Sequence, residues 1–232
     1  MTGRLPGRAA TSGSTTARCL IYVTPDAERT MCTYLGASTQ LEPDDLDLSM
    51  VKQTKVLYLE GYLWDSPAAK RAFIAAAEAC KGEGGQVALS LSDGFCVDRH
   101  RDSFLELVNG HVDVLFANES EITSLYSTDD FDSALAQVKG CCSVAALTRS
   151  EQGSVVLSGD QRWDIPSYAL GDLIDTTGAG DLYAGGFLHG YTQGLALETC
   201  GRIGSICAGQ VVTQLGPRSQ VSLKDLVAQH LS

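Results

Sequence analysis

Residues 175–181 (DTTGAGD) place a run of small residues directly before Asp181 and before an apolar segment that can form a helix. Gly178, Ala179 and Gly180 are small enough for backbone N–H groups to approach an anion, and the N-terminus of the following helix adds the positive end of its dipole. The Asp181 carboxylate can then act as general base on a hydroxyl while the amides hold a transferring phosphoryl group. The alternative is a glycine-rich helix start with an aspartate in its first turn, which is common.

The glycines of this segment do not fit the two common nucleotide-binding loops. The sequence contains no G-x-x-x-x-G-K-[ST] string, so a P-loop is excluded. Gly178 and Gly180 resemble the start of G-x-G-x-x-G, but the third position is Tyr183 and the preceding stretch is not a clean strand. A dinucleotide-dependent oxidoreductase therefore rests only on the general α/β pattern, which is a weak basis for function.

Upstream of this segment, short β-prone runs alternate with helical segments. This alternation predicts an α/β fold: a mainly parallel, Rossmann-like sheet with helices on both faces, and ligands at the carboxyl ends of the strands. The β-prone runs are 55–60, 86–92, 112–117 and 143–148, and the helical segments begin at 67, 97, 118 and 130. Two more runs, 153–157 and 162–165, predict a β-meander at the sheet edge, and the chain is helical in pattern from 179 onward.

The N-terminal region departs from this pattern. Residues 1–18 are rich in Gly, Ser, Thr and Arg and lack the apolar centre of a signal peptide, so we interpret them as a disordered or aberrant lead. The runs 19–23 and 30–35 flank Pro25-Asp26 and predict a β-hairpin. Residues 19–232 are expected to form one domain with this hairpin as a small appendage.

Composition and charge limit the partners. The 232 residues include 44% hydrophobic and 19% charged residues, which is ordinary for a globular protein. The net charge of −11 disfavours nucleic acid as a partner, because an acidic protein repels a phosphate backbone. No apolar run approaches the roughly 20 residues of a membrane helix. The eight cysteines show no C-x-x-C pair, which indicates reduced thiols and a cytoplasmic protein.

Two more segments at strand ends carry polar residues. Asn118 and Glu121 lie three residues apart in NESE and offer the oxygen ligands that Mg²⁺ prefers. The same spacing is also that of a helix capping box. Thr148 and Gly153 bracket TRSEQG between two β runs, where a hairpin turn closed by glycine is an equally good interpretation.

These segments together resemble the ribokinase-like (PfkB) carbohydrate kinase family. Residues 175–181 are similar to its C-terminal signature, and NESE matches its N-x-x-E motif. The resemblance implies ATP and Mg²⁺ as cofactors, with Asp181 as catalytic base and the preceding small residues as an anion hole. It also implies that Asn118 and Glu121 help to hold Mg²⁺ and its waters near the phosphates.

The resemblance further implies which residues of the site lie near the nucleotide. TRSEQG looks like the family's T-x-x-x-x-G segment, so Thr148 and Gly153 are expected near ATP. Ser205 is expected near the adenine. Asp175 and Thr177 are expected at a monovalent-cation site that would take K⁺.

The acceptor implied by the resemblance is a sugar or a nucleoside. Residues 24–31 (TPDAERTM) and 93–101 (DGFCVDRHR) look like the adenosine-kinase-like branch, so an adenosine-like acceptor is favoured. Within the second segment, Arg99 and Arg101 are placed to meet phosphate, although a solvated helix face explains them equally well.

The resemblance also implies an N-terminal part that precedes residue 19 and carries an acceptor-binding Asp and a Gly-Gly motif. Because neither is found there, we expect an N-terminally truncated kinase domain with a partial lid at 19–36. The expected function is ATP-dependent phosphorylation of an alcohol group, and the alternative is a catalytically inactive nucleotide-binding fragment. An exposed sheet edge would reduce stability, and a second subunit could complete the lid in a homodimer.

Overall fold

A six-stranded sheet with the strand order β3-β4-β5-β6-β7-β8 forms the centre of the molecule. In the computed structural model, which describes residues 13–231, β3 to β6 run parallel while β7 and β8 are antiparallel. The mainly parallel sheet and its edge meander are thereby confirmed. The strands are β3 Val56–Glu60, β4 Gln86–Ser90, β5 Val114–Asn118, β6 Val144–Thr148, β7 Ser154–Ser158 and β8 Gln161–Ile165.

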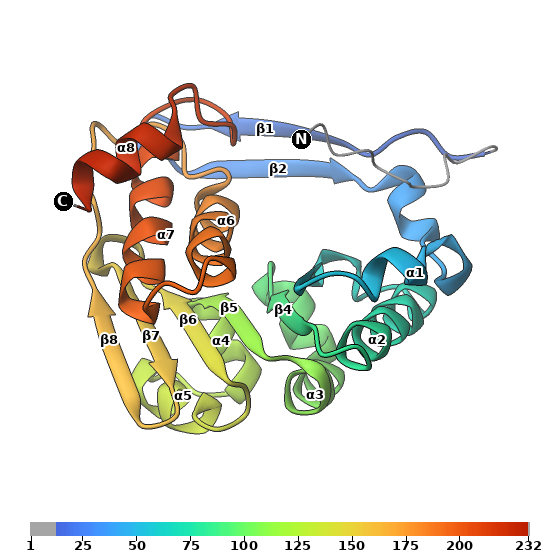
Figure 1. Cartoon of the computed structure of the whole chain (residues 1–232). Coiled ribbons are helices and arrows are strands. Elements are labelled where there is room, and N and C mark those ends of the chain that lie inside the picture. The colour runs from blue at the N-terminus through green and yellow to red at the C-terminus, as the bar shows by residue number, and fades with distance from the viewer. Residues whose placement is uncertain (1–12, 232) are drawn as a thin grey trace.

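Helices cover both faces of this sheet, as the alternation predicted (Figure 1). Helices α2 to α5 pack on one face, and α6 and α7 pack on the other. None of the helices described over residues 13–231 is long and apolar enough to cross a membrane. The helices are α1 Leu48–Val51, α2 Pro67–Lys81, α3 Gly94–His111, α4 Glu119–Tyr126, α5 Phe131–Val138, α6 Ala179–Thr192, α7 Leu197–Val211 and α8 Leu223–His230.

Side-chain caps fix where several of these helices begin. Ser66 accepts a hydrogen bond from the Ala69 N–H at the start of α2. Asp93 accepts hydrogen bonds from the backbone N–H groups of Phe95 and Cys96, so α3 begins at Gly94, three residues before the predicted start. Such a cap satisfies N–H groups that have no partner within the helix.

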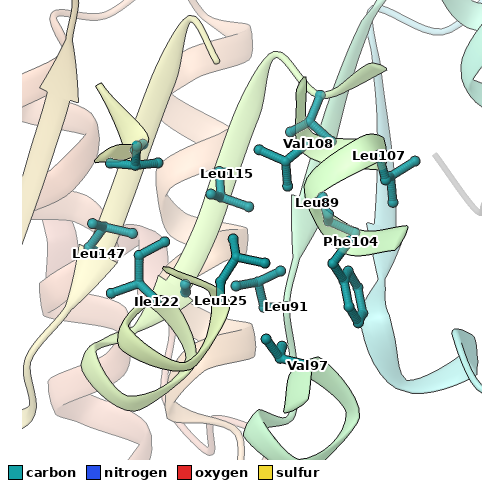
Figure 2. Packing of buried hydrophobic residues seen from close by; sticks show 14 of the residues in the cluster. Leu89, Leu91, Val97, Phe104, Leu107, Val108, Leu115, Ile122, Leu125 and Leu147 are labelled. Atoms are coloured by element: carbon teal, nitrogen blue, oxygen red, sulfur yellow. The ribbon is translucent and has the colours of Figure 1, made fainter. Parts of the chain in front are cut away.

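The larger core fills the space between the sheet and α2 to α5. Apolar side chains of three neighbouring strands meet those of α3 and α4 there (Figure 2). Burial of these groups is the main force that holds the helices on the sheet. The labelled members of this core are Leu89, Leu91, Val97, Phe104, Leu107, Val108, Leu115, Ile122, Leu125 and Leu147.

The second core lies under α6 and α7. Phe116 of β5 packs edge-on against Tyr183 and Phe187 of α6. The two helices approach closely at Gly186, where an added Cβ would lie 2.9 Å from the Cys207 Sγ. This close contact sets the direction of α6 and therefore the position of its N-terminus.

Strands β1 (Arg18–Val23) and β2 (Arg29–Tyr34) form a separate antiparallel hairpin, which confirms the predicted one. It crosses beyond the ends of α6 and α7 and leads toward α1 and α2 (Figure 1). Nearly all of its residues are exposed on both faces. Of the predicted lead, residues 1–12 lie outside the described part of the chain, and the Thr15 carbonyl accepts a hydrogen bond from the Ala37 N–H.

Replacement of Leu115 by Ala should lower the free energy of unfolding by about 2–5 kcal/mol, because it leaves a cavity at a fully buried position of β5. Urea denaturation followed by circular dichroism would measure this loss. Leu20→Ala on the hairpin is the matched control and should change stability little, since that side chain is 63% exposed. Equal losses in the two variants would contradict this account of the core.

Candidate active site

The loop before α6 has the geometry that its small residues predict. Gly178 is the N-cap residue and has φ 83° and ψ 4°, in the left-handed region. A Cβ there would lie 2.6 Å from the Cβ of Pro217, so only glycine fits. No side chain caps this helix start, and Asp181 is exposed in its first turn. The first-turn N–H groups and the Asp181 carboxylate are thus available to a ligand at the same helix end.

The buried carboxylate of Asp175 holds this loop in place through hydrogen bonds. Asp175 is 2% exposed; its Oδ1 accepts hydrogen bonds from the Thr177 N–H at 2.9 Å and the Thr177 hydroxyl at 2.6 Å. Its Oδ2 accepts one from the Gly216 N–H at 2.9 Å. Burial alone would raise the pKa of Asp175, but these hydrogen bonds outweigh it and lower the pKa. Both oxygens therefore serve to hold the loop, and the monovalent-cation role of Asp175 and Thr177 stays a prediction.

Arg29 connects the hairpin to this loop. It was not predicted as a site residue from the sequence. Its Nη1 donates a hydrogen bond of 2.5 Å to the Thr176 hydroxyl, across 147 residues of chain. Its positive charge also contributes to the lowered pKa of Asp175. A guanidinium beside an uncapped helix N-terminus makes this side of the loop more favourable for an anion.

Asn118 and Glu121 lie at the start of α4, where they form the capping box that was the alternative interpretation. Asn118 Oδ1 accepts a hydrogen bond from the Glu121 N–H, and Glu121 Oε2 accepts one from the Asn118 N–H. Glu121 is only 7% exposed. Burial, followed by the charges of Asp93 and Glu60, raises the pKa of Glu121 to about 7, although the hydrogen bond from Asn118 opposes this.

Glu60 is a second residue of the candidate site that was not predicted from the sequence. It ends β3 and is half-buried, and its Oε2 accepts a hydrogen bond of 2.6 Å from the Ser92 hydroxyl. Burial raises its pKa, and the charge of Asp181 raises it further, so the two carboxylates lie in the same region of the site. Tyr62 borders that region as well, because partial burial and then the charge of Asp181 raise its pKa to about 12. The signal in the sequence that could have identified Glu60 is a charged residue at the end of an apolar strand.

Thr148 and Gly153 bracket a tight connection between β6 and β7. Gly153 has φ 83°, and a Cβ there would collide with the Ile165 carbonyl oxygen, so the turn requires glycine. The hairpin interpretation is thus observed, and a nucleotide role stays a prediction. Ser205 is buried on α7, beside Gly204, which packs on Tyr183; its role near adenine also stays a prediction.

The two arginines of the 93–101 segment make ion pairs within the protein. Arg99 donates to Asp65 at 2.8 Å, and Arg101 donates to Asp98 at 2.9 Å and to the Ser124 carbonyl. Arg99 is exposed, as a solvated helix face predicts, whereas Arg101 is partly buried against α4, and a phosphate role of either residue stays a prediction. The arrangement as a whole places an exposed carboxylate, uncapped amides and a set of acidic groups at the carboxyl ends of the strands.

The raised pKa of Glu121 predicts that stability falls as pH rises. A carboxyl whose pKa is raised on folding holds its proton longer in the folded state, so its stabilising effect is complete below about pH 4.5 and is lost by about pH 7. Glu121→Gln should remove a pH-dependent loss of about 3 kcal/mol. Urea denaturation at pH 5 and pH 8 would measure this. Glu106→Gln, at an exposed position of α3, is the control, and a similar flattening in that variant would contradict the assignment.

Solved structures of kinases share this fold. The adenosine kinase from Sinorhizobium meliloti is 50% identical with a TM-score of 0.90, and the match covers 94% of this chain and 67% of that one. A putative ribokinase II from E. coli, solved in complex with ATP and Mg²⁺, matches with a TM-score of 0.80 over 91% of this chain and 71% of its own. Its sequence identity is 20%, so this likeness concerns the fold alone.

Comparison of the sequence with known proteins also finds sugar and nucleoside kinases. A nucleoside kinase from Methanocaldococcus jannaschii is 34% identical over 133 residues, which cover 56% of this chain and 42% of that protein. The chain thus matches less than half of the length of this curated relative. Residues 9–224 match the pfkB family carbohydrate kinase description. The chain therefore belongs to the pfkB family of carbohydrate kinases.

Proposed function

We propose that the chain takes part in ATP-dependent phosphoryl transfer to an alcohol group of a sugar or nucleoside, with Asp181 as the general base. The observation that carries this proposal is the exposed Asp181 carboxylate in the first turn of α6, beside N–H groups that no side chain caps. The amides of Gly178, Ala179 and Gly180 are suited to stabilise charge that develops on the phosphoryl oxygens. Asp181 would take the proton of the attacking hydroxyl.

The acidic groups of the site fit Mg²⁺ and its phosphate ligand. Glu121 is buried, and the neighbouring charges that raise its pKa are those of Asp93 and Glu60. A divalent cation would supply the positive charge that favours the ionised carboxylate, and Asn118, whose Oδ1 accepts hydrogen bonds from the Glu121 N–H and the Ser120 hydroxyl, would act through the waters of the cation. When bound, Mg²⁺ supplies charge neutralisation for the phosphates. Thr148, Gly153 and Ser205 remain the proposed nucleotide residues, and K⁺ at Asp175 rests on resemblance alone.

The acceptor is proposed to lie between Asp181 and the end of β3. The charge of Asp181 acts on Glu60, and the Glu60 carboxylate accepts hydrogen bonds from the Ser92 and Tyr58 hydroxyls, so a remaining lone pair can accept one from an acceptor hydroxyl. Tyr62 is 50% exposed and offers an aromatic surface there. An adenosine-like nucleoside is favoured, which agrees with the adenosine kinase activity in the name of the Sinorhizobium relative.

A nucleotide-binding fragment without turnover is the second candidate function. It is motivated by length, since the chain covers 67% of the Sinorhizobium kinase and 42% of the Methanocaldococcus kinase. Residues that bind the acceptor in those proteins can lie in the part that has no counterpart here. Binding of ATP with Mg²⁺ but no phosphorylation of any acceptor would support this candidate.

Replacement of Asp181 by Asn should lower the rate of phosphorylation by on the order of 10²–10⁴, because it removes the base and keeps the shape of the side chain. ATP-dependent phosphorylation of a panel of sugars and nucleosides, adenosine included, would measure this. The control is Asp172→Asn, an exposed position before the loop that should leave the rate unchanged. Unchanged turnover in Asp181→Asn would refute the base assignment.

The hairpin supports a homodimer as a further part of the proposal. Arg29 contacts the loop before α6, so the strand face that carries Arg29 points to the site. The opposite face carries Leu20, Tyr22 and Tyr34, which are 63%, 59% and 54% exposed. A two-stranded hairpin is only marginally stable alone, and a second copy of this face would bury these side chains.

Replacement of Tyr22 by Glu should therefore shift the protein from dimer to monomer, because it places a charge in the centre of the proposed interface. Sedimentation velocity at several protein concentrations would measure the shift. Tyr62→Glu, an aromatic position that is also half exposed but follows β3 and is not part of the hairpin, should leave the dimer intact. A monomeric unsubstituted protein would rule out this interface.

A further inference from the structure

Arg149 joins three segments at the carboxyl edge of the sheet. It follows β6, and its Nε and Nη2 donate hydrogen bonds of 3.0 and 3.3 Å to the two carboxylate oxygens of Glu119, the first residue of α4. Its guanidinium carbon lies 4.1 Å from the centre of the Phe131 ring, at the start of α5. Its backbone N–H donates a hydrogen bond of 2.7 Å to the Gly153 carbonyl.

The pair is built more firmly than an ordinary surface ion pair. The side chains of Arg149 and Glu119 are 24% and 41% exposed, and the buried Phe131 ring lies under the guanidinium. A planar guanidinium can make the two parallel hydrogen bonds and the ring contact at once, which an ammonium group cannot. The geometry therefore holds the β6–β7 connection against the first turn of α4.

These two segments have different proposed roles. The first turn of α4 carries Asn118 and Glu121, which are proposed to hold Mg²⁺. The connection closed by the backbone of Arg149 carries Thr148 and Gly153, which are proposed to lie beside the nucleotide. Asn118 and Thr148 are also register partners at the ends of β5 and β6, so the two segments start side by side.

We propose that Arg149 is a positioning residue that couples nucleotide binding to Mg²⁺ binding by fixing these two segments against each other. The inference rests on the proposed function, because it assumes that the site binds both. Coupling between two ligands is reciprocal, so Mg²⁺ should tighten ATP binding by the same factor as ATP tightens Mg²⁺ binding. Loss of the link should reduce this factor.

Calorimetric titration of ATP with and without Mg²⁺ tests the proposal directly. The binding of Mg²⁺ to free ATP is the same in every experiment, so differences between variants belong to the protein. In Arg149→Met and Glu119→Gln, the tightening of ATP binding by Mg²⁺ should fall by about tenfold, within the usual range of such couplings. The double variant should lose no more than either single variant, because both remove one interaction.

Two further variants separate positioning from general stability. Arg149→Lys keeps the charge but not the paired hydrogen bonds, so it should recover only part of the coupling. Arg162→Met removes more exposed ion pairs, with Asp164 at 2.7 Å on β8 and with Asp132 at 3.6 Å on α5, and should leave the coupling unchanged. An unchanged coupling in Arg149→Met, or an equal loss in Arg162→Met, would overturn the proposal.

Amide hydrogen exchange provides a readout that does not depend on ligand. In Arg149→Met the amides of Gly153 and Glu121 should both exchange faster than in Arg162→Met, since the link holds both segments. Unaltered exchange at either amide would overturn the link. If the unsubstituted protein binds no ATP, the proposed function fails, whereas the exchange result still decides whether Arg149 joins the segments.

Discussion

The buried carboxylate of Asp175 is the constraint that places the active-site loop. It accepts hydrogen bonds from Thr177 in its own loop and from the Gly216 N–H, 41 residues further along the chain. A buried ionised carboxylate is costly unless it is hydrogen-bonded, so the two segments are held together strongly. Gly178 follows directly and packs against Pro217. The direction of the α6 N-terminus, and with it the position of Asp181, depends on this junction.

Negative charge dominates the rest of the site. Glu60 lies at the end of β3, Glu121 at the start of α4 and Asp181 at the start of α6, and the pKa of Glu60 and Glu121 is raised by burial and by neighbouring carboxylates. Such a region repels a polyphosphate on its own. A divalent cation between these groups and the phosphates would reverse that repulsion, while Arg29 and the helix N-terminus act on the other side of the loop. These charges support the proposed role of Mg²⁺.

The features that could be predicted from the sequence are those that depend on residues adjacent in the chain. The mainly parallel sheet and its edge meander could be anticipated because short apolar runs alternate with helical segments, and the loop at 175–181 determines its own turn and helix start. The start of α3 was predicted late, because the Asp93 cap stands in a polar stretch without helical periodicity. Arg29 could not be found in this way, since its partner Thr176 is 147 residues away and only the hairpin brings them together. Glu60 could be predicted as a site residue only if it were known that β3 ends near Asp181.

Asn118 and Glu121 form a capping box, and their proposed role at Mg²⁺ has to be weighed against it. The capping box uses both Glu121 oxygens, which accept from the Asn118 N–H at 2.9 Å and from the Asn118 Nδ2 at 2.8 Å. It therefore fixes the carboxylate without any cation, and the nearby N-terminus of α4 favours its negative charge. Burial and the charges of Asp93 and Glu60 act in the opposite direction and raise the pKa of Glu121 to about 7. A carboxylate whose position is fixed but whose charge is disfavoured gains most from a nearby cation, which supports the proposed metal role of this motif.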